Sequence, residues 1–203
     1  MQILHLDSSI SGDASASRNL TTDIVKELSC DRPDAKVVYR DLVKDAIPHL
    51  TGPIAAGFRK VQVNSFDADT LAEQARSKTL VEELLASDII VFGVPMYNFS
   101  VPSQLKAWLD RVVQPGRTFQ YLESGPVGLT TGKRAIVASS RGGAYSIGPA
   151  NVMDFQEAYL KAILGFIGIT DVSFVRAELL SKGADTRIKS LEAAHASIKT
   201  VVR

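Results

Sequence analysis

The stretch Ile89-Ile90-Val91-Phe92-Gly93 is continuously apolar and is followed at once by Val94-Pro95-Met96-Tyr97-Asn98. An apolar run of this length without alternation is typical of a strand that is covered on both faces of a parallel sheet. The stretch therefore predicts an α/β protein in which this strand lies in the interior of the sheet.

Four more short strand-like runs lie on either side of it, and helical patterns separate most of them. The runs are Ile3-Leu4-His5-Leu6, Lys36-Val37-Val38-Tyr39-Arg40, Ala135-Ile136-Val137-Ala138 and Val172-Ser173-Phe174-Val175. The second run alternates in polarity, which indicates an edge strand with one partly exposed face. The helical patterns cover residues 18–29, 68–86, 102–113, 151–168 and 184–202.

Strands that alternate with helices predict a parallel sheet with right-handed crossovers. Five such strands match the flavodoxin-like doubly wound fold, with strand order 2-1-3-4-5 and helices on both faces. No repeat or linker marks a second domain, so we expect a single domain over residues 1–203. Two long irregular segments, about 43–67 and 114–133, are expected to elaborate this domain, and loops of this length are often functional.

Composition excludes several classes of protein. The chain has 203 residues, 23 Lys+Arg against 22 Asp+Glu, a formal charge of +1, and a single cysteine, Cys30. One cysteine excludes a disulfide-stapled module and favours a reducing cytoplasm, although it leaves the role of Cys30 open. No apolar stretch is long enough to span a membrane, and the balanced charge argues against nucleic-acid binding. His5, His49 and His195 have no metal-ligand spacing, so we expect no metal.

In a sheet of this order, ligands bind beyond the carboxyl ends of strands 1 and 3. The loop after strand 1 carries five serines, Ser8, Ser9, Ser11, Ser15 and Ser17, just before a helix. Hydroxyl groups and the free N–H groups of a helix N-terminus bind phosphate well. Ordinary N-capping accounts for one of these serines but not for the cluster, so we favour a phosphate site.

Two more loops are expected at the same edge. Val94-Pro95-Met96-Tyr97-Asn98-Phe99-Ser100-Val101-Pro102 combines flat apolar side chains with polar groups, which suits a planar heteroaromatic ring. Ser139-Ser140-Arg141-Gly142-Gly143 follows strand 4, and its glycines let the backbone approach a ligand closely. Arg141 either carries charge toward the ring or is a solvated loop residue.

Several other functions lack their motifs. No Gly-x-Gly-x-x-Gly follows strand 1, and Gly128-Leu129-Thr130-Thr131-Gly132-Lys133-Arg134 is too short for a P-loop and precedes a strand. A receiver domain needs an acidic pair after strand 1, where only Asp7 occurs. No Gly-x-Ser-x-Gly nucleophile elbow is present, so a hydrolase is not expected.

These loops, taken together and in this order, resemble the FMN-dependent NADH-azoreductases, a branch of the flavodoxin-like NAD(P)H:quinone oxidoreductases. The matching pieces span residues 8–171. They are Ser8-Ser9, Ser15-Ala16-Ser17, Pro95-Met96-Tyr97-Asn98-Phe99, Gly125-Pro126-Val127-Gly128-Leu129, Gly132-Lys133, Ser139-Ser140-Arg141-Gly142-Gly143 and Leu164-Gly165-Phe166-Ile167-Gly168-Ile169-Thr170-Asp171.

The resemblance implies a site for each part of FMN. Ser9, Ser15, Ala16 and Ser17 would hold the phosphate, with Ala16 contributing only its backbone N–H. Pro95, Met96, Tyr97, Asn98 and Phe99, together with Ser140, Arg141, Gly142 and Gly143, would cradle the isoalloxazine ring. Phe99, Tyr121 and Phe166 match aromatic residues of the family's substrate pocket, which lies at the boundary of a homodimer.

The resemblance also implies the reaction. NADH or NADPH would reduce FMN and leave, and a quinone or azo compound would then collect the electrons in the same pocket, with reductive cleavage of an azo bond. No side chain is expected to act as a catalytic acid or base, because the flavin carries the chemistry. Arg59 would either reach the nicotinamide cofactor or lie free on the surface.

Two alternatives stay open. One is a NAD(P)H:quinone reductase whose azo activity is incidental. The other is a flavodoxin-type electron carrier that binds FMN without reducing a substrate, although such carriers are usually strongly acidic.

Overall fold

The apolar run at 89–93 forms the central strand of a five-stranded sheet. This strand, β3 (Ile89–Pro95), lies between β1 (Gln2–Asp7) and β6 (Arg134–Ser140). The sheet order is β2-β1-β3-β6-β7, and every neighbouring pair is parallel. Counted along the sheet strands alone, this is the predicted order 2-1-3-4-5, and the alternating run is the edge strand β2 (Lys36–Asp41). The structure, a computed structural model, describes residues 1–30, 32–59 and 66–203.

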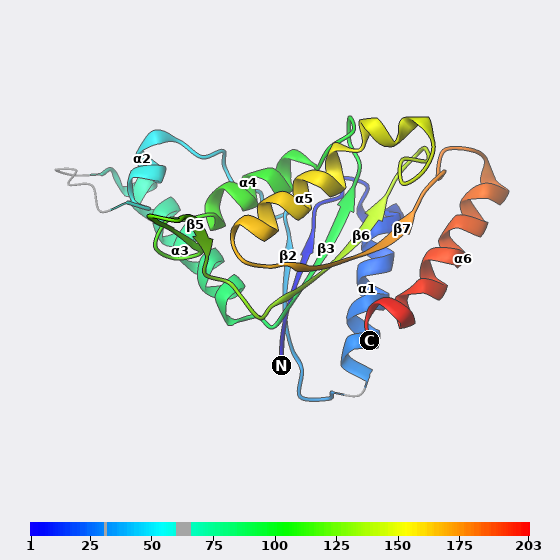
Figure 1. Cartoon of the computed structure of the whole chain (residues 1–203), viewed down its shortest axis with the longest axis horizontal. Helices are drawn as coiled ribbons and strands as arrows, with labels where there is room; N and C mark the ends of the chain where they lie inside the picture. Colours follow the sequence, from blue (N-terminus) through cyan, green and yellow to red (C-terminus); the bar gives the residue numbers. More distant parts are fainter. Residues whose placement is uncertain (31, 60–65) are drawn as a thin grey trace.

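Helices cover both faces of the sheet (Figure 1). The helices are α1 (Ala16–Cys30), α2 (Gly52–Ala56), α3 (Ala68–Ala86), α4 (Ser103–Val112), α5 (Phe155–Phe166) and α6 (Ala184–Val201); the last sheet strand is β7 (Asp171–Ala177), and the 3-10 turns are η1 (Gly12–Ala14) and η2 (Pro149–Met153). One face of the sheet packs against α1 and α6, which contribute Leu20, Ile24, Ala194 and Ile198 to a shared apolar cluster. The other face packs against α3, α4 and α5, whose buried residues include Leu84, Trp108 and Leu160.

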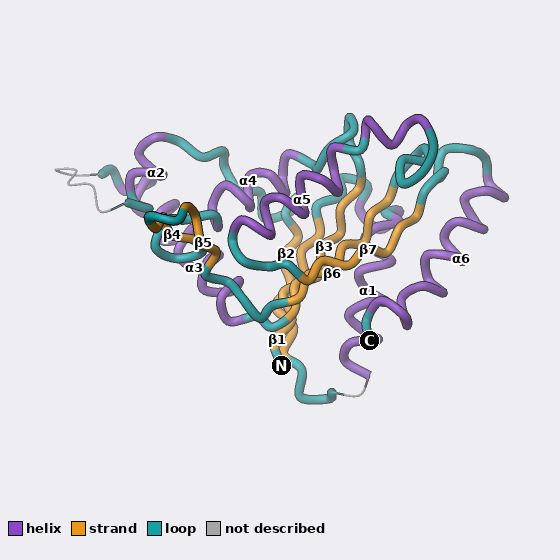
Figure 2. Tube along the Cα trace, in the orientation of Figure 1, coloured by secondary structure: helices purple, strands orange, loops and turns teal. Residues whose placement is uncertain are grey.

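Two expectations about local structure were wrong. The segment 114–133 is not irregular throughout, because β4 (Phe119–Leu122) and β5 (Gly125–Gly128) pair as an antiparallel hairpin outside the main sheet (Figure 2). The helix expected from residue 151 begins only at Phe155. Its N-cap is Asp154, whose carboxylate accepts hydrogen bonds from the N–H groups of Gln156 and Glu157, each at 3.0 Å, and thereby ends the preceding 3-10 turn.

The long segment 43–67 contains the short helix α2, and residues 60–65 of it lie outside the described residues. No helix in the described part of the chain is long and apolar enough to cross a membrane.

The β4–β5 hairpin approaches the connection between α5 and β7 closely, backbone against backbone. A Cβ at Gly128 would overlap backbone atoms of Gly168 and Ile167, so only glycine fits at this position. Two residues further on, the Thr130 N–H and hydroxyl both donate to the Ile167 carbonyl, at 2.9 and 2.6 Å. This contact brings together two glycine-containing motifs, at 125–129 and 164–171, that are distant in the sequence.

Candidate functional site

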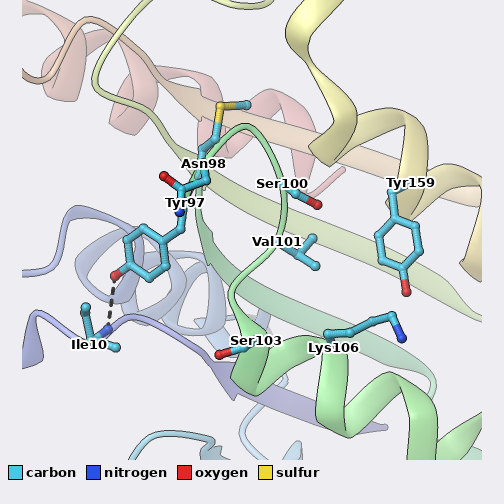
Figure 3. A pocket seen from close by; sticks show the side chains of 9 residues that line it. Ile10, Tyr97, Asn98, Ser100, Val101, Ser103, Lys106 and Tyr159 are labelled. Atoms are coloured by element: carbon cyan, nitrogen blue, oxygen red, sulfur yellow. Dashed lines mark hydrogen bonds between the residues drawn. The ribbon is translucent and has the colours of Figure 1, made fainter.

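The three loops expected at the carboxyl edge of the sheet meet there and are hydrogen-bonded to one another. The Ser8 hydroxyl donates to the Gly93 carbonyl at 2.6 Å, which joins the loop after β1 to β3. The Met96 N–H donates to the Ser140 carbonyl at 2.8 Å, which joins β3 to β6. The Ile10 N–H donates to the Tyr97 hydroxyl at 3.2 Å (Figure 3). The strand order reverses between β1 and β3, so the loops form one site at the switch point.

The serine loop presents unused donors to a cavity. Ser9, Ser15 and Ser17 are buried. Ser15 caps α1, because its hydroxyl accepts from the Arg18 N–H at 3.3 Å, and it contacts the Ser17 hydroxyl at 3.1 Å. The N–H groups of Ala16 and Ser17 have no acceptor within the helix and none elsewhere among the described residues. Capping therefore explains Ser15 alone, and the remaining donors suit an anion.

A charged pair fixes this loop from behind. The Arg18 guanidinium donates to the Ser9 carbonyl at 2.8 Å and forms a two-pronged ion pair with Asp41 at 2.7 and 2.8 Å. The hydrogen bond from Arg18 lowers the pKa of Asp41 to about 2. The sequence reasoning missed this pair. Its one signal is that Asp41 ends the edge strand opposite Asp7, where the carboxyl edge must lie.

A tight turn follows β3, and two of the predicted cofactor residues, Asn98 and Phe99, lie at its centre. Tyr97 and Ser100 exchange two backbone hydrogen bonds of 3.1 Å each. Between them, Asn98 and Phe99 both have positive φ angles, 47° and 70°. A two-residue turn with both central residues in this region matches the twist of paired strands, but it is strained for a phenylalanine. The Phe99 ring meets Tyr145 edge-on, with 6.1 Å between ring centroids.

The carbonyl groups of the glycine loop after β6 are hydrogen-bonded to the segment that follows β7. The N–H groups of Leu179, Leu180 and Ser181 donate to the carbonyls of Gly143, Arg141 and Gly142 at 3.0–3.2 Å. The N–H groups of Gly142 and Gly143 donate to no described residue. A Cβ at Gly142 would lie 2.8 Å from the Ser181 hydroxyl. The loop therefore offers two free backbone donors where a side chain would crowd the neighbouring segment.

Arg141 is not a solvated loop residue, because only 1% of it is exposed. Its guanidinium forms ion pairs with Asp154 at 2.9 Å, Glu157 at 2.8 Å and Glu178 at 3.1 Å. Its Nε donates to the Ser139 hydroxyl at 2.9 Å. All of its donors are thus used inside the protein, and only its backbone is left for a ligand.

Glu178 links the Arg141 guanidinium to the next part of the loop, residues Tyr145 and Ser146. Its carboxylate accepts from the N–H groups of Tyr145 and Ser146 at 2.8 and 2.9 Å. Burial by itself would raise the pKa of Glu178, but hydrogen bonds from the Ser146 hydroxyl and these N–H groups outweigh it and lower the pKa. The ionised carboxylate therefore holds the loop beside Gly142 and Gly143.

Two adjoining cavities, each of about 230 Å³, run along this edge and share Met96 and Gly142. The first is lined by the serine loop and the second by the turn after β3. Together they are lined by most of the predicted cofactor residues, namely Ser9, Ser15, Ala16, Pro95, Met96, Tyr97, Asn98, Phe99, Ser140, Arg141 and Gly142. The Ser17 hydroxyl contacts that of the lining residue Ser15, and Gly143 follows the lining residue Gly142. Ser181 and Arg187 also line the first cavity, and the sequence reasoning missed both.

A larger open pocket of about 860 Å³ lies on the other side of the turn after β3 (Figure 3). Tyr97 and Asn98 border it on one side, and Lys106 and Tyr159, from α4 and α5, border it on the other. A hydrogen bond from Lys106 to Asp110, at 2.7 Å, raises the pKa of Lys106. The sequence gives no signal for this pocket, because α5 reaches it only through the packing of the helices.

The predicted substrate-pocket residues fall into two separate groups. Arg59 and Tyr121 line a cavity of about 420 Å³ beside the β4–β5 hairpin. Phe119 joins Tyr121 to Phe166 there, with ring centroids 5.4 and 4.6 Å from its own. Phe99 instead borders the cavities at the carboxyl edge. In Figure 1 the hairpin lies far to the left of the β3 tip, so one chain does not bring the two groups together.

Known proteins resemble this chain in sequence and in fold. The sequence profile of a family described by its flavodoxin-like fold matches residues 1–202. The chain is 68% identical over 202 residues to a Ralstonia nicotianae protein named FMN-dependent NADH:quinone oxidoreductase, covering 100% of this chain and 97% of that protein.

Solved structures share the fold. An azoreductase from Bacillus anthracis superimposes with a TM-score of 0.90 at 25% identity, over 100% of this chain and 98% of that one. An FMN-dependent NADH-azoreductase from the same species, solved in complex with FMN, superimposes with a TM-score of 0.86 at 20% identity and full coverage of both chains. At 20% identity, the similarity to this second structure supports a shared fold only.

Proposed function

Because this chain belongs to the flavodoxin-like family and, within it, to the FMN-dependent NADH:quinone oxidoreductases, we propose that it uses bound FMN to carry electrons from NADH to quinones and azo compounds. The observation that carries this proposal is the set of uncommitted donors along two adjoining cavities at the switch point of the sheet. When bound, FMN supplies a carrier that accepts two electrons from NADH and returns them to an acceptor.

The residues at the edge fit the two ends of this cofactor. The Ala16 and Ser17 N–H groups and the Ser9 hydroxyl would bind the phosphate at the start of α1. The Gly142 and Gly143 N–H groups would donate to the pyrimidine edge of the isoalloxazine ring. Donors fixed in this way stabilise negative charge on the reduced ring without reorganising. Met96 and Phe99 would provide the flat apolar contacts.

We propose a homodimer in which a second copy completes the acceptor pocket. Tyr121 is 71% exposed and Leu122 is 51% exposed on the β4–β5 hairpin, and both are apolar surface that a partner would cover. The open pocket beside Tyr97 is large enough to receive such side chains. One pocket, used in turn by NADH and by a flat acceptor, would then lie between the cradle of one copy and the aromatic cluster of the other.

The single cysteine, Cys30, agrees with a cytoplasmic location, which we also propose.

The purified protein should show flavin absorbance in the visible range, or gain it when FMN is added. NADH oxidation should then accelerate on addition of either a quinone or an azo dye, with no protein partner present. An electron carrier behaves differently, because it needs a redox protein to accept its electrons. NADH oxidation that rises only with such a partner, or a protein that takes up no flavin, would contradict the proposal.

A mixing experiment tests the shared pocket. A Ser9→Ala/Ser17→Ala variant has a damaged cradle, and a Tyr121→Ser variant has a damaged aromatic cluster. Each alone should reduce quinones poorly. After the two are unfolded together and refolded, hybrid dimers should regain activity, because one of their two sites combines an intact cradle with an intact cluster. Refolding each variant alone is the control, and no gain on mixing would mean that the pocket does not lie between two copies.

A further inference from the structure

One residue of α6, Arg187, lines the cavity beside the serine loop. This helix packs along α1, and both helices begin at the carboxyl edge of the sheet (Figure 1). The loop that leads into α6 is bonded to the glycine loop through Leu179, Leu180 and Ser181. Gly183, at φ 100°, turns the chain into the helix. The start of α6 is therefore held against the same cavity as the start of α1.

Arg187 brings a positive charge to this cavity. It lies in the first turn of α6, where its N–H donates to the Gly183 carbonyl at 3.0 Å, and it lines the cavity together with Ser9, Ser15 and Ala16. It is half-buried. Among the described residues, side-chain hydrogen bonds and ion pairs are formed by arginines such as Arg18, Arg141 and Arg176. The Arg187 side chain forms none with any described residue.

The two other arginines nearest the cavity are already committed. The Arg18 guanidinium is paired with Asp41 and holds the Ser9 carbonyl from behind the loop. The Arg141 guanidinium is buried and already paired with three carboxylates, those of Asp154, Glu157 and Glu178. Both guanidinium groups are therefore engaged by carboxylates of the protein, and neither is free to pair with an anion in the cavity.

We propose that Arg187 is the charged partner of the FMN phosphate and that it makes the site prefer FMN to riboflavin. The proposal rests on the proposed function, in which the phosphate lies at the serine loop. A phosphate monoester carries about −1.5 to −2 charges at pH 7. A guanidinium binds such a group with two parallel hydrogen bonds, which are about twice as strong as those between neutral groups. The serine loop supplies neutral donors, and Arg187 supplies the charge.

The test compares two flavins that differ only in the phosphate. Apoprotein is titrated with FMN and, separately, with riboflavin, and binding is followed by the quenching of flavin fluorescence. Arg187→Ala should raise the dissociation constant of FMN about tenfold, as loss of one charge-assisted hydrogen-bonding group predicts, and should leave that of riboflavin unchanged. Arg187→Lys should retain part of the preference. Lys189→Ala is the matched control, because it removes an equal charge from an exposed position of the same helix and should change neither constant.

The outcomes separate this inference from the function on which it rests. If wild-type protein binds FMN and Arg187→Ala binds it equally well, the role of Arg187 is refuted while the flavin site stands. If the variant loses FMN and riboflavin to the same extent, Arg187 supports the fold rather than the phosphate, and the inference is again refuted. If wild-type protein binds neither flavin, the proposed function itself fails, and the inference fails with it. Thermal unfolding of the apoproteins, which should match, shows that the variant is folded.

Discussion

Replacing Arg141 with methionine should lower the free energy of unfolding by about 3–5 kcal/mol, the range expected when one partner of a buried ion pair is removed. The guanidinium is buried and pairs with Asp154, Glu157 and Glu178, at distances of 2.8–3.1 Å. Methionine fills a similar volume but leaves three carboxylates close together with one cation fewer. Urea unfolding of the apoprotein measures the loss without a contribution from bound flavin.

Arg176→Met is the matched control for this prediction. Arg176 pairs with the same Glu157, at 2.6 and 2.8 Å, but its side chain is 39% exposed. Exposed pairs contribute about 0–1 kcal/mol, so this variant should unfold almost as the wild type does. Equal losses from the two variants would show that burial of Arg141 is not what makes it important. Arg141→Lys should recover part of the loss, because a lysine restores the charge but not the planar set of donors.

Removing the Ser9 and Ser17 hydroxyls together should weaken FMN binding about a hundredfold. Both serines are buried: Ser9 lines the same cavity as Ala16, and Ser17 is the second residue of α1. A hydrogen bond to a charged group contributes about 1.5–3 kcal/mol, and each 1.4 kcal/mol is a factor of ten in affinity. The measurement is FMN affinity of the Ser9→Ala/Ser17→Ala apoprotein by fluorescence quenching.

Ser29→Ala provides the control for the serine loop, because Ser29 lies at the other end of α1 and its hydroxyl has no hydrogen-bond partner among the described residues. FMN affinity should not change in this variant. Riboflavin affinity should change little in either variant, since riboflavin lacks the phosphate. Unchanged FMN affinity in the double variant would remove the serine loop from the phosphate site.

Much of the fold is local enough to be predicted from sequence. The continuously apolar run at 89–93 is buried on both faces, and the alternating run at 36–40 is the edge strand, because burial pattern follows position in a sheet. The β4–β5 hairpin was missed because its strands have four residues each and include Gly125, Pro126 and Gly128, which are poor strand formers. In the fold, the hairpin backbone at Gly128 packs against Gly168, a contact between distant segments that local patterns do not record.

The predicted site divides in the same way. The serine, aromatic and glycine loops could be assigned to one edge, because the carboxyl ends of parallel strands lie together. The direction of the Arg141 side chain could not be assigned, since its three acidic partners lie on segments that are joined only by packing. The separation of Phe99 from Tyr121 and Phe166 likewise depends on where the hairpin lies.

By itself, the sequence determined the doubly wound sheet, its order, and the edge of the sheet at which the serine, aromatic and glycine loops meet. Those features depend on the periodicity and composition of short segments, which local rules relate to burial and to helix ends. Only the tertiary structure decided which arginines are engaged by carboxylates and that Arg187, at the start of the last helix, faces the first loop. The ion-pair partners of a long charged side chain depend on which distant segments pack near it, and the spacing of residues along the sequence does not specify this.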